Sequence, residues 1–215
     1  MLVRFRIRGN LRFLSHAETL KVFQRACVRA GIDIRYSEGF NPHPRLSLPL
    51  PRPVGVESDD ELLALIVSCP PDRTPAQLAE WTSSALAAEL PEGCELLSVT
   101  AAGGAAMPHP SSATYVLAVG PEYINDELGN TIRHLLASDT LVVRRQTDAK
   151  ASRFRDVDVR GFLRSVELSD GCVSVECETS SAGSIRVEEI LELLMLDADK
   201  LVRPIKRTNV QWQTS

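Results

Sequence analysis

The chain has 215 residues, of which 44% are hydrophobic and 24% are charged, proportions typical of an ordinary globular protein. No run of about 18 apolar residues occurs, so the sequence predicts no membrane-spanning helix. Residues 1–6 lack the apolar stretch of a signal peptide. Five cysteines without a regular spacing fit buried thiols better than a disulfide framework, so we expect a cytoplasmic protein.

The net charge of −4 hides an uneven distribution along the chain. Residues 1–56 contain ten lysines and arginines against three acidic residues, whereas residues 57–150 contain five against fourteen. A basic segment in an acidic protein favours a local site for an anion, and phosphate is the usual candidate. The alternative is that these cations lie on solvated faces and pair with acidic residues from later in the chain. The sequence leaves both interpretations open.

The first half of the chain has the pattern of a mixed α and β domain. Residues 2–8 alternate apolar side chains with arginines, which predicts a strand with one buried face and one arginine-bearing face. Residues 15–18 form a capping-box pattern that starts a helix, and Gly31 ends that helix. Further elements are expected as strands or extended segments over 32–36, 46–50, 61–68 and 94–101, and as a helix over 74–90. The resulting order is β-α-β-β-α-β.

The second half repeats that order in its predicted elements. Residues 103–112 are small, glycine-rich and proline-rich, which is typical of a linker. The expected elements after it are strands over 113–120, 140–146, 163–168, 172–179 and 201–212, and helices over 125–137 and 186–196, with a polar excursion over 147–162. We therefore predict an α+β fold of two tandem ferredoxin-like (βαββαβ) domains, with residues 1–102 and 113–215 on either side of the linker.

The stretch Tyr-Ser-Glu-Gly-Phe-Asn-Pro-His-Pro-Arg at residues 36–45 is the strongest candidate for a site. Its glycine, asparagine and two prolines predict a stiff, turned loop that cannot be helical. It carries an aromatic ring on each side of a carboxylate, then an amide, an imidazole and a guanidinium, and loops held between regular elements often carry function. The alternative is a connector whose polar side chains only satisfy its own backbone.

Arginines next to aromatic residues extend this candidate site to the segment before the first helix. Arg12 is followed by Phe13, and Arg45 is close in sequence to Tyr36 and Phe40, a pairing that stacks bases and holds phosphates when it is exposed. The alternative is that the phenylalanines belong to the core. The predicted substrate-binding residues are Arg12, Phe13, His16, Tyr36, Glu38, Phe40, Asn41, His43 and Arg45. In this interpretation Arg12, His16 and Arg45 hold phosphate.

The sequence predicts no metal site and no cofactor. It has no CxxC pair, no P-loop and no GxGxxG after a strand, and no cysteine cluster that would hold an iron–sulfur centre. His16, His43 and Tyr36 are candidates for general acid–base catalysis. However, in a β-α-β unit the start of the helix and the loop after the second strand lie at opposite ends, which argues against a direct pair between His16 and His43.

Three motifs, at residues 11–16, 36–45 and 53–58, resemble the radical SAM-linked bacterial family of unknown function. Members of that family occur alone or fused to a cobalamin-binding radical SAM domain. The chain departs from the family pattern at Ala17 and Glu18, where leucine and aspartate are expected. The resemblance implies a partner role beside a radical SAM enzyme and a link to RNA metabolism, because genes of the family tend to lie near a ribonuclease gene.

Three functions are therefore consistent with the sequence. The first is a non-catalytic accessory domain that presents RNA, or another phosphate-bearing substrate, to a radical SAM partner in trans. The second is a metal-independent RNA endonuclease, by analogy with tandem ferredoxin-like enzymes that process RNA. The third is a protein-interaction module whose loop docks a partner.

Overall fold

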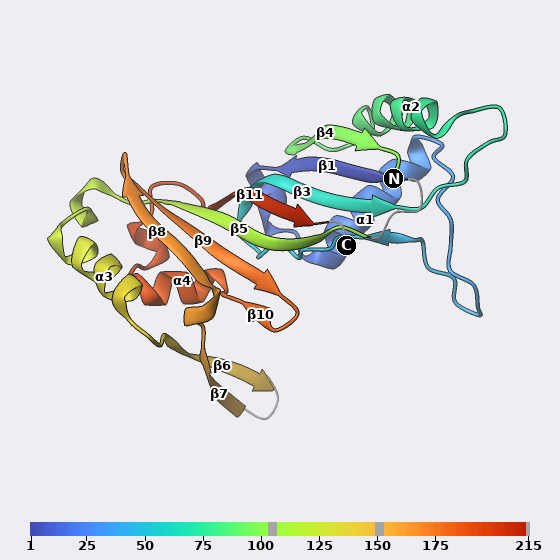
Figure 1. Ribbon diagram of the computed structural model, residues 1–215. Helices are drawn as coiled ribbons and strands as arrows, with labels where there is room; N and C mark the ends of the chain where they lie inside the picture. Colours follow the sequence, from blue (N-terminus) through green and yellow to red (C-terminus); the bar gives the residue numbers. More distant parts are fainter. Residues whose placement is uncertain (103–106, 149–152, 214–215) are drawn as a thin grey trace. The chain divides into compact units, whose positions relative to one another are not determined.

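A computed structural model describes residues 1–102, 107–148 and 153–213. It is a mixed α+β structure whose strands pair antiparallel (Figure 1). The chain divides into two compact units, Met1–Pro110 with the residues from Trp212 onward, and Ser111–Gln211. The helices found in the described residues are α1 (His16–Arg29), α2 (Pro75–Ala87), α3 (Asp126–Ala137) and α4 (Val187–Leu193). None of the helices in these ranges is long and apolar enough to cross a membrane.

The first unit has the predicted element order β-α-β-β-α-β. Its strands are β1 (Leu2–Ile7), β2 (Leu46–Ser47), β3 (Glu57–Leu65) and β4 (Cys94–Thr100), and they pair in the order β4-β1-β3-β2. The strand predicted over 32–36 is reduced to isolated bridges at Ile34 and Tyr36, because Tyr36 faces Pro44, which has no N–H to extend a ladder. For the same reason Pro49 limits the extended segment 46–50 to the two residues of β2.

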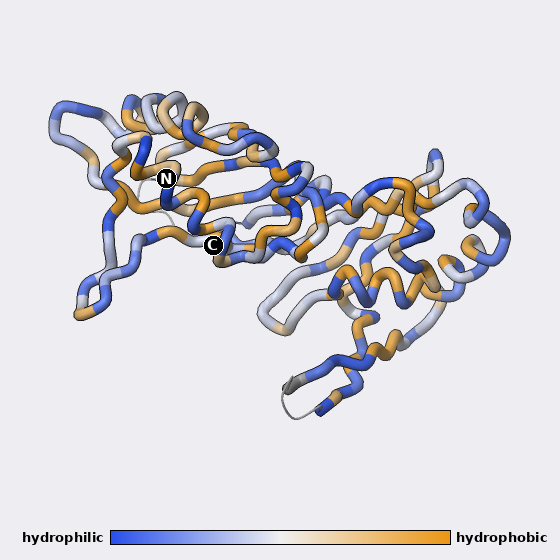
Figure 2. The backbone as a smooth tube through the Cα atoms, turned by 180° about the vertical axis from the view of Figure 1, so that it is seen from behind, coloured by the Kyte–Doolittle hydropathy of each residue, from blue (hydrophilic) through white to orange (hydrophobic). Residues whose placement is uncertain are grey.

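Strand β1 has the two faces that its alternation predicts. Val3, Phe5 and Ile7 are buried, and the ring of Phe5 packs edge-on against Phe23 of α1 at 4.5 Å between centroids. Leu86 of α2 belongs to the same buried cluster, so both helices contribute to one core on this face of the sheet. Figure 2 shows hydrophobic and hydrophilic positions alternating along the strands of this unit.

Helix α1 begins where the capping-box pattern predicts. The Ser15 hydroxyl accepts a hydrogen bond from the Glu18 N–H at 3.3 Å, and the Glu18 carboxylate accepts one from the Ser15 N–H at 2.9 Å. The helix ends before Gly31, whose φ of +68° suits a residue without a Cβ. Its buried face carries Phe23, and its opposite face is exposed.

The second unit contains one strand more than expected within its polar excursion. Its strands are β5 (His109–Ala118), β6 (Val142–Asp148), β7 (Arg153–Asp158), β8 (Leu163–Ser169), β9 (Cys172–Ser180), β10 (Gly183–Ser184) and β11 (Lys206–Gln213). In its sheet β5 lies between β9 and β11, while β8 and β10 both pair with β9. β6 and β7 form a separate two-stranded ribbon.

The polar excursion predicted over 147–162 contains strand β7, which the sequence pattern did not predict. The register of the ribbon places Arg144 directly opposite Asp156, and opposite charges across a pair stabilise it. Arg144 also lies over the ring of Phe154 at 4.7 Å. The next pair of the ribbon is not matched in this way, since Arg145 lies opposite Arg155.

The ribbon β6–β7 is tied to α4 by a buried ion pair. Arg145 donates to both carboxylate oxygens of Glu189, at 2.6 and 2.8 Å, and also to the Ser184 carbonyl at 2.6 Å. The Arg145 and Glu189 side chains are only 13% and 8% exposed. Glu189 also accepts a hydrogen bond from the Arg186 N–H at the start of α4, so one carboxylate serves both the ribbon and the helix.

The predicted linker 103–112 falls partly outside the described residues, which leave out 103–106. Within the described part, β5 begins at His109, so its first residues lie inside the predicted linker. The domain boundaries at 102 and 113 stay a prediction.

Candidate functional site

The stretch 36–45 forms a hairpin that projects from the first unit. Its base is closed by a hydrogen bond from the Arg45 N–H to the Arg35 carbonyl at 2.8 Å. Further out, the Ser37 N–H donates to the His43 carbonyl at 2.8 Å, and the Ser37 hydroxyl accepts from the His43 N–H at 2.9 Å. Figure 1 shows this segment as a light-blue excursion that extends away from the sheet. We call residues 36–44 the hairpin.

The turn of the hairpin follows from its sequence. Gly39 has a φ of +122°, a value that side chains rarely allow, and Pro42 and Pro44 fix the returning arm in an extended form. Phe40 comes directly after this glycine and is fully exposed, at 112% of its reference area, while Tyr36 is 48% exposed. The hairpin is otherwise hydrophilic along most of its length (Figure 2). The prediction of a turned, non-helical loop is confirmed, and its stiffness stays a prediction.

Most polar side chains of the hairpin are free to bind something else. Glu38, Asn41, His43 and Arg45 are exposed, and in the described part of the chain none of them makes an ion pair or a side-chain hydrogen bond. Only Ser37 satisfies the hairpin backbone with its side chain. These side chains therefore do not serve the backbone of the hairpin, and their role in binding stays a prediction.

The structure does not bring Arg12, Phe13 and His16 to the hairpin. Arg12 and Phe13 lie in a 3-10 turn that follows the end of β1, near Ser58, to which Ile7 is paired. The hairpin instead follows the far end of α1, and its base is bonded to residues after β3, through the Arg35 N–H and the Ile66 carbonyl. The 14 residues of α1 span about 20 Å. Arg12 and His16 therefore lie at the opposite end of α1 from Arg45 and His43, as the caution against a His16–His43 pair expects. That Arg12, His16 and Arg45 each hold phosphate stays a prediction.

Arg12 and Phe13 form a contact of their own. The Arg12 guanidinium lies 4.2 Å from the Phe13 ring centroid and donates to the Gly9 carbonyl at 2.9 Å. Phe13 is 54% exposed, so it is not a core residue. His16 lies in the first turn of α1, and its Nδ1 is buried without a hydrogen-bond partner in the described residues.

Sequence reasoning missed Arg52, which organises this end of the unit. Arg52 is 8% exposed, and its two terminal nitrogens donate to five backbone carbonyls at 2.6–3.3 Å. The acceptors are Leu11, Arg12, Leu14, Pro53 and Val56. Two of the three motifs that carry the family resemblance, 11–16 and 53–58, are thus joined by one buried guanidinium. An arginine between two prolines, followed by Gly55, is the signal that could have drawn attention to it.

Four of the ten lysines and arginines in residues 1–56 pair with acidic residues from later in the chain. Arg4 pairs with Asp60, and Arg8 pairs with Asp59. Arg6 bonds Glu95 at 3.2 Å, and Arg29 bonds Glu89 at 2.7 Å. The interpretation that these arginines pair with later acids is therefore confirmed for these four. In the described residues, the cations of this segment that have neither an ion pair nor a side-chain hydrogen bond are Lys21, Arg25, Arg35 and Arg45.

A family match extends over nearly the whole chain. Residues 1–204 match a family described as "Uncharacterized protein conserved in bacteria (DUF2344)". The chain belongs to this family. The expectation of a bacterial family without an assigned function is thereby confirmed. No curated protein matches the chain.

Among solved structures, this DUF2344 chain is similar to one chain in a crystal structure of a Cbf5-Nop10-Gar1 complex. The identity is 10% and the TM-score is 0.48, with 97% of this chain and 48% of the other chain covered. The DUF2344 chain thus spans about half the length of that protein.

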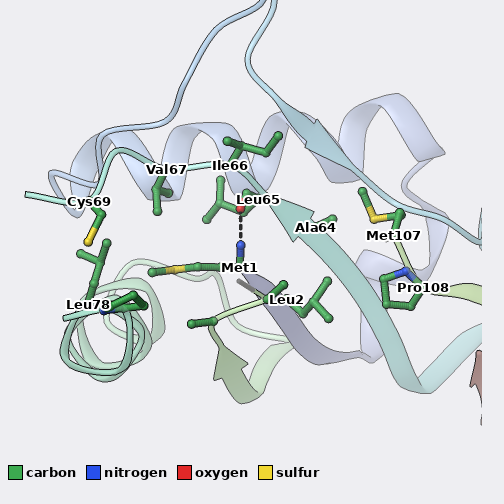
Figure 3. Close-up of a pocket in the computed structure, with 13 residues that line it drawn as sticks. Met1, Leu2, Ala64, Leu65, Ile66, Val67, Cys69, Leu78, Met107 and Pro108 are labelled. Carbon is green, nitrogen blue, oxygen red and sulfur yellow. Dashed lines mark hydrogen bonds between the residues drawn. The ribbon is translucent and has the colours of Figure 1, made fainter. Parts of the chain in front are cut away.

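The first unit of this DUF2344 protein also contains an apolar pocket of about 400 Å³, which none of the predicted site residues lines (Figure 3). Its lining residue Ile66 donates from its N–H to the Arg45 carbonyl at 3.1 Å. The Met1 ammonium lies in its wall and donates to the Leu65 carbonyl at 2.6 Å, and burial lowers the pKa of this amine. The Cys69 thiol lies at the pocket beside Leu78 (Figure 3). The remaining lining residues are Leu2, Ala64, Ile66, Val67, Pro75, Ala101, Ala102, Met107 and Pro108. Such a surface accepts apolar groups. In the described ranges, no group of three His, Cys, Asp or Glu side chains is arranged to hold a metal ion.

Proposed function

We propose that this chain is an accessory binding protein that presents RNA, or another phosphate-bearing substrate, to a radical SAM enzyme, and that the hairpin is its binding element. The observation that carries the proposal is Phe40, fully exposed at the turn of a hydrogen-bonded hairpin. Tyr36 is half exposed on the same hairpin, and Arg35 and Arg45 lie at its base. Exposed rings beside guanidinium groups stack on unpaired bases and hold phosphates.

The radical SAM partner is proposed from the sequence resemblance. The motifs at 11–16, 36–45 and 53–58 resemble the radical SAM-linked family. In this proposal the chain supplies binding, and the partner supplies the iron–sulfur cluster, because the five cysteines of this chain form no cluster motif in the sequence.

Binding is a better account of the hairpin than cleavage. A general acid and a general base must both reach the reacting atoms, and His16 lies at the opposite end of α1 from His43. His43 and Tyr36 share the hairpin, but both are exposed, whereas efficient acid–base groups are positioned by their surroundings.

We also propose that each unit is a ferredoxin-like domain. The order β4-β1-β3-β2 in the first unit supports this proposal. In the second unit, the corresponding elements are β5, α3, β8, β9, α4 and β11, with β5 between β9 and β11 and β8 beside β9. The ribbon β6–β7 is then an insertion before β8.

The proposal is tested by binding of a fluorescent single-stranded RNA of about 16 nucleotides. We expect Phe40→Ala to weaken binding by about 5- to 160-fold, because stacking on one base contributes about 1–3 kcal/mol. Phe154→Ala is the matched control, since Phe154 is 50% exposed and also contacts an arginine. Equal affinities of Phe40→Ala and the wild type would remove the hairpin from RNA binding. Absence of RNA binding by the wild type at low salt would leave protein docking as the better account.

A further inference from the structure

We propose that the exposed face of α1, with Lys21 and Arg25 at its centre, is the site that holds the phosphate backbone of the RNA, while the hairpin stacks on its bases. This inference rests on the proposed function. It assigns the contacts with phosphate to a surface that lies outside the three sequence motifs. The surface consists of Lys21, Gln24, Arg25, Val28 and Arg29, whose side chains border a hollow of about 440 Å³.

The first argument is the elimination of the other cations. Of the ten lysines and arginines in residues 1–56, four form ion pairs, Arg12 lies against Phe13, and Arg52 is buried among carbonyls. Lys21 and Arg25 are exposed and have no ion pair in the described part of the chain. A free surface cation keeps its full attraction for an anion, whereas a paired one must first break its ion pair.

The second argument is the spacing on the helix. Lys21, Arg25 and Arg29 are four residues apart, so they form one row with a rise of about 6 Å between neighbours. This interval is comparable to the distance between neighbouring phosphates of a nucleic-acid strand. Within this row, Arg29 is paired with Glu89. Glu18, one turn before Lys21 on α1, accepts two hydrogen bonds from Ser15 and also attracts Lys21, which contributes to lowering the pKa of Glu18. Arg25 is the member of the row without an acidic neighbour in the described residues.

The third argument is that the row leads to the hairpin. Helix α1 ends at Arg29, and the Ile32 N–H donates to the Cys27 carbonyl at 2.9 Å, so the chain turns directly from the helix end. Three residues later it enters the base of the hairpin at Arg35. The two remaining free cations, Arg35 and Arg45, lie at that base. The free cations of the segment thus continue from α1 to the exposed aromatic rings.

The experiment separates charge from stacking through the salt dependence of binding. The logarithm of the affinity for a single strand falls with the logarithm of salt concentration by about 0.7 per phosphate contact. We expect Lys21→Gln/Arg25→Gln to make this slope shallower by about 1.4 and to weaken RNA binding by about 20-fold at 0.1 M salt. Inorganic polyphosphate, which has no bases, should also bind more weakly to this variant. Phe40→Ala should weaken RNA binding with the slope unchanged and should leave polyphosphate binding intact.

The control variant is Arg133→Gln/Arg164→Gln, which removes two exposed cations of the second unit and should keep the wild-type slope. Circular dichroism of each variant verifies that it is folded. If Lys21→Gln/Arg25→Gln keeps the wild-type slope while Phe40→Ala still weakens RNA binding, the inference fails and the proposed function stands. If the wild type binds no RNA at low salt, the proposed function fails, and the inference fails with it.

Discussion

Replacing Arg52 tests whether one buried guanidinium holds an end of the first unit together. Three of the five carbonyls bonded to Arg52 also accept a hydrogen bond from a backbone N–H. For the other two, the carbonyls of Leu14 and Val56, Arg52 is the one donor found in the described residues. Leaving a buried acceptor without its partner costs about 1–3 kcal/mol. Arg52→Met keeps most of the apolar stem and removes every donor. We therefore expect it to lower the free energy of unfolding by about 2–6 kcal/mol.

The assay is urea unfolding followed by tryptophan fluorescence, because both tryptophans, Trp81 and Trp212, belong to the first unit. The midpoint should fall while the slope of the transition stays constant, which marks a change in stability. Arg52→Lys should recover only part of the loss, since an ammonium cannot reproduce the fixed fork of donors. Arg8→Met removes an exposed ion pair with Asp59 and should change the free energy by less than about 1 kcal/mol. A change of less than about 0.5 kcal/mol in Arg52→Met would refute the reasoning.

Two further predictions concern the scaffold of each unit. Gly93→Ala should destabilise the first unit by about 1–3 kcal/mol, because Gly93 has a φ of +89° and a Cβ there would lie 2.6 Å from the Arg8 carbonyl oxygen. Gly129 lies on α3 with open space around it, so Gly129→Ala should instead stabilise the protein by about 0.5–1 kcal/mol. Urea titrations would show these opposite changes in the free energy of unfolding. Burial raises the pKa of Glu189, but the hydrogen bonds from Arg145 and the Arg186 N–H outweigh it, so the net shift is downward. Because the pKa of Glu189 is lower in the folded state, its ionised carboxylate stabilises the fold at pH values above the usual pKa of a glutamate, and this stabilisation is lost as the pH falls through the pKa of the folded state. Glu189→Gln should therefore lower the free energy of unfolding near pH 7 by about 3 kcal/mol. The variant should also lose less stability than the wild type on acidification, which circular dichroism would measure.

Local chemistry was predictable from the sequence where neighbouring residues determine it. The start of α1 depends on Ser15 and Glu18, three residues apart, and the alternation of β1 depends on adjacent residues. The shape of the hairpin follows from Gly39 and its prolines in the same way. These features need no information about the rest of the fold.

The features that sequence reasoning missed depend on residues that are distant in the chain. Arg6 meets Glu95 across 89 positions, and Arg52 bonds carbonyls up to 41 positions away. Residues 153–158 pair with β6 in a register that places Asp156 opposite Arg144 but Arg155 opposite Arg145, and the order of charges along the chain does not contain this register. The candidate site was divided for the same reason: its residues were grouped by chemical type, whereas the length of α1 separates them in space.

The difference in exposure among the cysteines would allow a chemical label to be attached at the apolar pocket. Burial raises the pKa of Cys27 to about 11. It is also the main reason why the pKa values of Cys94 and Cys177 are raised to about 12. These three thiols therefore stay protonated and shielded from solvent at neutral pH. Cys69, by contrast, is exposed at the pocket. A maleimide dye added briefly would therefore attach there in preference to the three buried thiols. The fifth cysteine, Cys172, is half-buried. With Cys172 replaced by serine, a dye on Cys69 would therefore report occupancy of the pocket without an introduced cysteine.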